Sequence, residues 1–454
     1  MKTLRSMLNL GTNALGTHRA TLSVLSKNIA NASTPGYSRE RLSIESMSFG
    51  LGAQVTGLTS LRDTTYQKAL LGASQELGFG QGKASVLEIA EPFVNDLDGA
   101  GMGPALDALF GALQSAGANP ADLNERGAVL DRARELADQI RNSATGLESA
   151  RRSAEKSAAA TVTEVNELAA QLARLNGQIR DIQGSGDPAL ELVDQRDELL
   201  AALGELVDVE VTTQGSDVNV ALAGGQPVVS GDTASTLSLS GGGSGPLTLS
   251  VARDNGLPLA GPKSLGGKLG GLLEARDGTL RSALDALDAT AEGLAGAMNA
   301  LHTSGFGLDG ATGRNLFDIT PGTGAASSLK LSADISGKPE FLAFAADGNL
   351  LPGDNHIAQQ LLAVRDLKLP NGKTPDGGLD EVTSTIASAL QAANGSAEGA
   401  ASRLADFEGL RASRSGVSIQ EEMVALTEAQ RAFEAASRIL KTADELYETV
   451  LQMV

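Results

Sequence analysis

The sequence predicts a mainly α-helical, elongated chain with a small all-β insertion, whose N- and C-terminal helices pair as a coiled coil at one end. Three observations carry this prediction. Apolar residues recur at heptad spacing near both chain ends, helical periodicity fills most of the interior, and a period of two replaces it in one interior stretch. At 454 residues and 41% hydrophobic content, the chain is long enough for about three domains, nested into a rod.

The first expected element is a helix near the N-terminus. Its apolar stripe advances in alternating steps of four and three, which is the spacing of a heptad seam. The seam residues are Leu4, Leu8, Leu15, Leu22, Leu25 and Ile29. Gly11 and His18 occupy two imperfect positions of the same seam. An ordinary amphipathic helix packed on a core would show a similar stripe, so the seam alone does not establish a coiled coil.

A connector with the sequence NIANASTPGYSR (28–39) ends this helix. Its principal residues are Asn28, Asn31, Pro35, Gly36 and Tyr37. Pro35 disfavours helical geometry at Thr34, and Pro35-Gly36 fits the centre of a type II turn because glycine accepts a positive φ. We expect the two asparagines to bond loop backbone groups and Tyr37 to anchor the connector, which turns the chain toward the outer domains. A plain helix stop is the simpler alternative.

The interior follows a nested order. Residues 123–203 show helical stripes, and Asp187-Pro188 resembles an N-cap followed by a first-turn proline. From Leu206 the period becomes two, and helical spacing returns after Pro262. The expected domains are a terminal polymerisation domain (1–60 plus 411–454), a helical rod (61–205 plus 263–410, with a loop-rich segment at 305–370) and a small β domain (206–262).

The C-terminal segment carries a second heptad seam. Its larger residues are Leu426, Phe433, Leu440, Tyr447 and Val450, with alanines between them. Residues 1–39 contain five basic residues and no acid, whereas residues 418–454 carry seven acids against three bases. Chain ends usually fray, so seams that reach both ends predict a partner, and the opposite charges suggest that the two helices pair with each other.

Composition excludes several function classes. The balance of 36 Lys plus Arg against 55 Asp plus Glu, a net charge of −19, argues against a nucleic-acid partner. No apolar run is long enough to span a bilayer, so we expect no membrane insertion. The N-terminus lacks the pattern of a cleaved secretory signal. With no cysteine, the chain has no disulfide framework and no cysteine-ligated metal site.

No catalytic or cofactor-binding motif is evident. The three histidines, His18, His302 and His356, stand far apart without metal-ligand spacing. The segment GFGQGKAS (78–85) resembles a phosphate loop but is one residue short and has Ala84 in place of Ser or Thr. Glu421 and Glu422 are adjacent carboxylates, which we interpret as a solvated helix flank. The sequence therefore predicts a chain that is not an enzyme and needs no cofactor.

The two ends resemble a known family. NIANASTPGYSR is similar to the signature of bacterial flagellar rod, hook and hook-associated proteins, and Ser415–Leu451 resembles their terminal helix. The interior segments 191–211, 266–280 and 353–362 resemble the hook-associated members that lie at the junction between hook and filament. The β segment and residues 320–350 carry no such resemblance.

The resemblance implies a function and a set of partners. Such proteins leave the cell unfolded by flagellar type III export, and they pack their terminal helices into an extracellular tube. The implied partners are other copies in a ring, the hook protein, a second hook-associated junction protein, and an export chaperone on the C-terminal helix. Alternatives are another axial component, such as a rod protein, hook protein or flagellin, or a secreted adhesin or enzyme built on flagellar-type ends.

Overall fold

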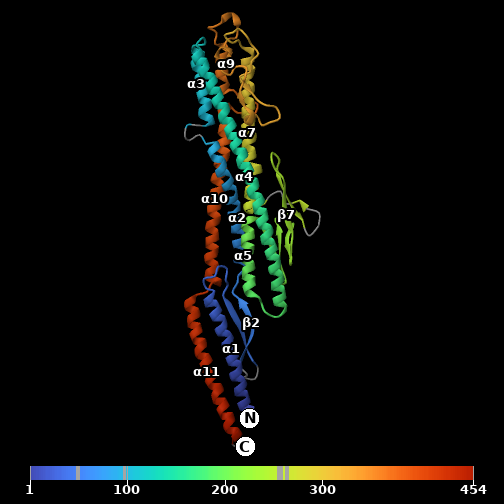
Figure 1. Ribbon diagram of the computed structural model, residues 1–454. Helices are drawn as coiled ribbons and strands as arrows, with labels where there is room; N and C mark the ends of the chain where they lie inside the picture. The colour runs from blue at the N-terminus through green and yellow to red at the C-terminus, as the bar shows by residue number, and fades with distance from the viewer. Residues whose placement is uncertain are drawn as a thin grey trace.

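The protein is a long, mainly helical rod. The computed structural model describes residues 2–47, 52–95, 99, 101–252, 259–260 and 265–452. Both chain ends lie at the same tip of the rod (Figure 1). Small antiparallel sheets form in three parts of the chain, within residues 40–60, 209–260 and 317–331. The predicted class, mainly α with a small β part in an elongated chain, is confirmed.

Two helices and a hairpin form one end of the rod. The elements are α1 (Lys2–Ala30), β1 (Glu40–Ser46), β2 (Ala53–Ser60) and α11 (Ile419–Gln452). Helices α1 and α11 lie side by side, while the antiparallel β1–β2 hairpin packs against α1 (Figure 1). We call residues 1–60 and 411–454 the terminal unit. The supercoiling of α1 with α11 stays a prediction.

The helical body, residues 61–410, continues the rod. Its main helices are α2 (Thr64–Ala90), α3 (Met102–Ala118), α4 (Leu123–Gly184), α5 (Leu190–Leu206), α6 (Gly267–Glu274), α7 (Leu280–Ser304) and α10 (Pro375–Ser415), whose last residues belong to the terminal unit. Fully buried large side chains such as Leu109, Phe110, Leu136 and Ile140 join these helices in one continuous core. The 62-residue helix α4 runs from the distal end back toward the terminal unit (Figure 1).

The segment GFGQGKAS (78–85) lies inside helix α2 and not in a phosphate loop. Its glycines are contact points with other helices: a Cβ on Gly80 would come within 2.9 Å of the Ala397 backbone nitrogen in α10. A Cβ on Gly82 would come still closer to the Lys268 carbonyl oxygen in α6. The glycines are therefore explained by close helix packing, for which only a hydrogen side chain leaves room.

The predicted cap at Asp187-Pro188 is wrong. Helix α5 starts at Leu190, and the position before it is Ala189, which adopts a left-handed φ of 52°. Asp187 accepts a hydrogen bond from the Ala189 amide at 2.8 Å, which forms a local turn. Asp187 therefore stabilises the loop between α4 and α5. The amide that it binds belongs to Ala189, the residue just before the first residue of the helix.

Strands within residues 209–260, in which the sequence shows a period of two, form two small sheets beside α4. The strands are β3 (Val209–Gln214), β4 (Asp217–Leu222), β5 (Pro227–Ser230), β6 (Thr233–Ala234), β7 (Thr236–Gly241), β8 (Leu247–Ala252) and β9 (Leu259–Ala260). Their orders are β3-β4-β5-β6 and β7-β8-β9, all antiparallel. Asn176 of α4 donates to the Val218 and Gly231 carbonyls at 2.8 Å each, which ties the first sheet to the helix. Residues 253–258 and 261–262 of the predicted β domain lie outside the described residues.

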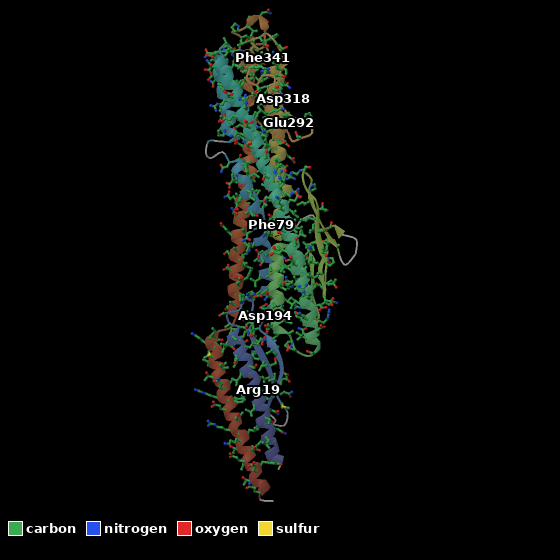
Figure 2. All side chains as sticks on the ribbon, viewed as in Figure 1. Arg19, Phe79, Asp194, Glu292, Asp318 and Phe341 are labelled. Carbon is green, nitrogen blue, oxygen red and sulfur yellow. The ribbon has the colours of Figure 1, made fainter. Side chains whose placement is uncertain are left out.

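The loop-rich segment closes the distal end of the rod. It contains β10 (Phe317–Asp318), α8 (Ala325–Ser328), β11 (Lys330–Leu331) and α9 (His356–Ala363), besides the short turns η4 (Pro339–Phe341) and η5 (Gly348–Leu350). Figure 2 shows Phe341 at this end. His302 organises the segment: its Nδ1 donates to the Arg314 carbonyl at 2.6 Å, and its Nε2 accepts from the Ala343 amide at 2.9 Å. Burial lowers the pKa of His302, so its neutral form is favoured.

Candidate functional site

The contact between α1 and α11 depends on small residues. Gly11, an imperfect position in the predicted seam, lies directly under Leu440: a Cβ on Gly11 would be 2.7 Å from the Leu440 Cδ1. On α11, Ala429, Ala436 and Ala443 are 7%, 6% and 3% exposed. Small residues at these positions bring the two helix axes close together.

The larger seam residues are only partly covered. Those of intermediate burial are Leu8, Leu15, Leu22, Leu25, Ile29, Leu426, Phe433 and Leu440. Tyr447 is 40% exposed. The side chains of Leu4 and Val450 lie outside the described residues. The structure thus brings the two predicted seams together but leaves much of their apolar surface in contact with solvent.

Asn28 is the centre of the connector. It is 1% exposed, and its amide makes four hydrogen bonds. The Nδ2 donates to the Glu40 carbonyl and to the Glu422 carboxylate, at 3.0 Å each. The Oδ1 accepts from the Tyr37 hydroxyl at 2.9 Å and from the Glu40 amide at 3.0 Å. Because an asparagine side chain offers two donor hydrogens and two acceptor lone pairs, its capacity is fully used. One residue therefore joins α1, the connector, β1 and α11.

The chain reverses at Thr34–Tyr37. The Tyr37 amide donates to the Thr34 carbonyl at 3.3 Å, and Gly36 has a φ of 75°, as a type II turn requires. A side chain on Gly36 would also collide with the Glu198 carboxylate of α5. Asn31 donates through Nδ2 to the Lys27 carbonyl at 3.0 Å, so it bonds the last turn of α1.

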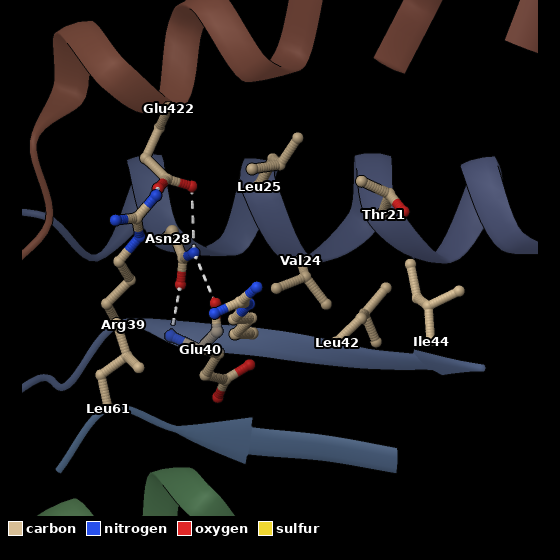
Figure 3. A pocket seen from close by; sticks show the side chains of 11 residues that line it. Thr21, Val24, Leu25, Asn28, Arg39, Glu40, Leu42, Ile44, Leu61 and Glu422 are labelled. Atoms are coloured by element: carbon tan, nitrogen blue, oxygen red, sulfur yellow. Dashed lines mark hydrogen bonds and ion pairs between the residues drawn. The ribbon is translucent and has the colours of Figure 1, made fainter. Parts of the chain in front are cut away.

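Two buried carboxylates flank Asn28, as Figure 3 shows. Glu422 is 0% and Glu40 is 3% exposed. Glu422 pairs with Arg39 at 2.6 Å, and Glu40 pairs with Lys27 at 2.7 Å, so each buried charge has a cation beside it. The interpretation of Glu422 as a solvated flank is wrong, whereas Glu421 is exposed. Helix geometry explains the difference, because Glu422 lies one step of four before Leu426 on the seam.

Helix α5 holds the connector against the body. The Ser38 amide donates to Asp194 at 2.9 Å, and burial raises the pKa of Asp194 to about 6. Figure 2 places Asp194 at the level where the terminal unit meets the body. Burial, reinforced by the carboxylates of Glu40 and Asp194, also raises the pKa of Tyr37, so its hydroxyl stays protonated as a hydrogen-bond donor to Asn28.

The C-terminal chain joins the same cluster. The Arg39 amide donates to the Ser415 carbonyl at 2.8 Å, and the Ser415 hydroxyl donates to the Leu61 carbonyl at 2.9 Å. Just beyond, Arg62 pairs with Asp197 of α5, with 2.6 Å between Nη2 and Oδ1. Both crossings of the chain between terminal unit and body are therefore fixed within one cluster, which we call the joint.

A pocket of about 430 Å³ opens beside the joint (Figure 3). Its apolar wall consists of Val24, Leu25, Leu42, Ile44 and Leu61, and its polar end holds Asn28, Arg39, Glu40 and Glu422. The polar groups at that end are engaged with one another through the bonds described above. The arrangement is that of a joint, because these groups hold α1, the connector, β1 and α11 together.

Sequence reasoning found the connector asparagine but missed four residues that bond around it. Ser38, Glu40, Asp194 and Glu422 come from three separate stretches of chain. Extending the C-terminal heptad by one step would have placed Glu422 opposite α1. No comparable signal in the sequence identifies Asp194, which lies on a helix of the body.

Across the part of the chain that the structure describes, no cluster of three or more His, Cys, Asp or Glu side chains is arranged to hold a metal ion. In the same residues, every helix is too short or too polar to cross a membrane.

Comparison with known proteins connects these features. The family described as "Flagellar hook-associated protein FlgK helical domain" matches residues 87–317, half of the chain. The ends match two further families, "Flagella basal body rod protein" at residues 8–37 and "Flagellar basal body rod FlgEFG protein C-terminal" at residues 411–453.

Individual relatives agree with these matches. Flagellar hook-associated protein 1 of Bacillus subtilis is 28% identical over 96% of both chains. The protein of the same name from Salmonella typhimurium is 29% identical over 70% of this chain, and the aligned part spans 60% of that relative. The solved structure of the flagellar hook junction protein FlgK from Burkholderia pseudomallei has the same fold, with a TM-score of 0.67 at 17% identity, over 78% of this chain and all of that one.

Rod-type signatures on two adjacent terminal helices, joined to a long helical body, define an axial protein of the bacterial flagellum. Within that class, the chain belongs to the flagellar hook-associated protein FlgK family. It is a hook-associated structural component of the flagellum, and the family inferred from the terminal motifs and the interior segments is confirmed.

Proposed function

We propose that copies of this chain form a ring at the distal end of the hook and join hook to filament by packing their terminal helices into a tube. The observation that carries the proposal is the distribution of exposed apolar side chains. Among the described residues, nine of the seventeen exposed large apolar residues lie in the terminal unit, which is less than a quarter of the chain. They are Met7, Leu10, Ile44, Ile419, Met423, Val424, Ile439, Leu446 and Tyr447.

The buried side chains have the opposite distribution. Within the described part of the terminal unit, Ala429, Ala436 and Ala443 are the only buried apolar residues. The larger seam residues are half-covered by one neighbouring helix. Apolar surface left open in this way marks an interface with further chains, whose burial would supply the free energy of assembly.

The joint gives the assembly its geometry in this proposal. Asn28, Tyr37 and the turn at Pro35-Gly36 hold the terminal unit at a fixed orientation to the body, so that the inner helices and the outer domains of neighbouring copies align. Asn28 of α1 bonds both Glu40 of β1 and Glu422 of α11, which supports this role.

The partners and the route follow from the family. In this proposal the ring contacts the hook protein on one side and a second hook-associated junction protein on the other. The chain leaves the cell by flagellar type III export, with a chaperone on the C-terminal helix, and acts outside the cell as a structural protein without cofactor or catalysis. The partly covered seam on α11 supports a chaperone site there.

Two seam variants test the proposal. Leu22→Asp and Leu440→Asp should abolish incorporation into flagella while the helical body stays folded, because a carboxylate in the seam opposes its burial. Leu350→Asp, a change of the same kind at a 61% exposed position of the body, serves as the control and should incorporate normally. Normal joining of hook to filament by both seam variants would refute the seam as the assembly surface.

Electron microscopy of a strain lacking the gene tests the position. We expect hooks without filaments, with flagellin released into the medium. Loss of the hooks themselves would assign the chain to the rod or the hook instead.

A further inference from the structure

Helix α11 has a second stripe beside its seam. It advances in the same alternating steps of three and four, displaced by one residue, and we call it the outer stripe. Its members are Ala425, Glu428, Ala432, Ala435, Ile439, Thr442 and Leu446. Ile439 is 54% and Leu446 is 48% exposed, and α1 is the element against which α11 packs. The outer stripe is therefore a largely exposed helix face with two large apolar side chains.

Helix α1 differs, because another element covers its second apolar face. The β1–β2 hairpin lies there: Thr17 donates to the Ala53 carbonyl at 3.0 Å, and a Cβ on Gly52 would be 3.0 Å from the Leu10 Cδ1. One heptad-spaced stripe of α1 stays fully exposed, and we call it the polar stripe. It consists of Asn9, Thr12, Gly16, Arg19, Ser23, Ser26 and Ala30.

Helices α1 and α11 carry opposite net charges, but their described side chains form no ion pair with each other. Helix α1 contains four basic residues and no acid, whereas α11 contains seven acids and three bases. Among the side chains that the structure describes, no ion pair connects α1 with α11, and neither Arg19 nor Glu428 takes part in one. Figure 2 shows Arg19 on α1. This complementarity is therefore available for contact between chains.

We propose that the outer stripe of α11 binds the polar stripe of α1 from a second copy, with Arg19 of that copy beside Glu428. The inference rests on the proposed function, because it assumes that the terminal helices assemble. It assigns the face of each helix and the charge pair that selects the partner. The seam between α1 and α11 then closes each copy, and the outer stripe joins one copy to the next.

The register follows from contacts within one chain. Asn28 of α1 bonds Glu422 of α11, and Gly11 of α1 contacts Leu440 of α11. A residue of α1 and a residue of α11 therefore lie at the same height along the rod when their residue numbers add to about 450. Copies related by rotation in a ring stand at equal height. Arg19 is then about one helical turn, roughly 5 Å, from Glu428, within reach of its side chain.

The same register brings apolar and small residues together. Ile439 stands level with Thr12, and Ala435 with Gly16. A Cβ on Gly16 would meet nothing within 4 Å in one chain, so this face has room for a neighbouring helix. Packing there would cover the outer stripe without displacing α1 from the seam.

A charge reversal tests the pair in the full chain, expressed in a strain that lacks the gene. Arg19→Glu and Glu428→Arg should each reduce the number of filament-bearing cells by about tenfold or more, because like charges then face each other. The double variant restores opposite charges and should return to within about twofold of the wild type. Both residues are exposed, so the circular dichroism of all three purified variants should match the wild type.

The control is Glu434→Arg. It makes the same charge change on α11, but Glu434 lies about 120° around the helix from Glu428, so normal assembly is expected. Wild-type assembly of both single reversals, or a double variant as defective as the singles, would overturn the inference. If Leu22→Asp and Leu440→Asp still abolish assembly in that case, the proposed function stands and only the outer-stripe contact fails.

Discussion

The terminal unit and the helical body bury their apolar residues in different ways. In the body, whole large side chains such as Leu109, Phe110 and Leu136 are enclosed by neighbouring helices of the same chain. In the described part of the terminal unit, the enclosed side chains are three alanines of α11, Thr17 of α1 and a cluster of polar groups at the joint, while leucines and isoleucines stay half-covered or exposed. The body therefore completes its own core, whereas the terminal unit requires further chains to complete its packing.

The joint lies between the terminal unit and the helical body. Its buried groups are mostly polar and are joined by specific hydrogen bonds, which define geometry more sharply than apolar contacts do. A terminal unit with little core of its own can thus be held at a defined orientation before assembly.

The largest contrast is expected from truncating one leucine in each region. Leu136→Ala should reduce the free energy of unfolding of the body by roughly 2–5 kcal/mol, since it leaves a cavity in a closed core. Leu22→Ala removes a half-covered side chain of α1 and should change the unfolding of the body by less than about 0.5 kcal/mol. Urea denaturation followed by circular dichroism measures both, and equal losses would erase the distinction.

A smaller effect is expected at the joint. Asn28→Ala leaves the Glu40 amide and the Tyr37 hydroxyl without their acceptor and removes one donor from the buried Glu422 carboxylate, at a local cost of about 1–3 kcal/mol. Hydrogen exchange should accelerate at residues 38–41 and stay unchanged in α4. Asn31→Ala is the matched control, because Asn31 is only partly buried and bonds its own helix. Exchange at 38–41 that is no faster than in this control would show that Asn28 does not organise the joint.

Next in size is the turn glycine. Gly36→Ala should destabilise the joint by about 1 kcal/mol or more, because alanine resists the positive φ and its Cβ meets Glu198. Gly127→Ala, in open space on helix α4, should instead stabilise the body by about 0.5–1 kcal/mol. Thermal unfolding of both variants checks the two signs, and a stabilising Gly36→Ala would contradict the turn.

The smallest effect is expected from mild acid, which acts with opposite sign on two buried groups, His302 at the distal end of the body and Asp194 at the joint. Burial lowers the pKa of His302 below its usual value of 6.5, so its contribution to stability is present above that pH and is lost as the pH falls through the lowered pKa. Burial raises the pKa of Asp194 from 3.8 to about 6, so its contribution is full below 3.8 and is lost as the pH rises through about 6.

Subtraction of matched variants isolates each group. Urea denaturation gives the free energy of unfolding. As the pH falls from about 7.5 to 5.5, the value for the wild type should decrease relative to His302→Gln and increase relative to Asp194→Asn. A shift of the opposite sign in either subtraction would contradict the environment described for that group.

Part of this structure was predictable because local pattern determined it. The heptad spacing of Leu8, Leu15 and Leu22 required a helix with one apolar face, and the alternation in DVNVAL required a strand. The turn at Pro35-Gly36 was predictable for the same reason, since its geometry depends on two adjacent residues.

The remainder depends on contacts that sequence spacing does not encode. Gly11 looked like a defect in the seam until Leu440, more than four hundred residues away, was found against it. Glu422 looked solvated until Asn28 and Arg39 were found beside it. Ala189 replaced the expected Asp187 cap because the loop geometry, and not the local preference, determines where α5 begins.

Hydrogen exchange on the purified chain and on the same chain within isolated flagella tests the central claim most directly. In the free chain, amides of residues 6–30 and 419–449 should exchange at least about a hundredfold faster than those of residues 129–179 in α4, and assembly should protect them. Terminal helices that are already as protected as α4 in the free chain, with no change on assembly, would contradict the claim that other copies complete their packing.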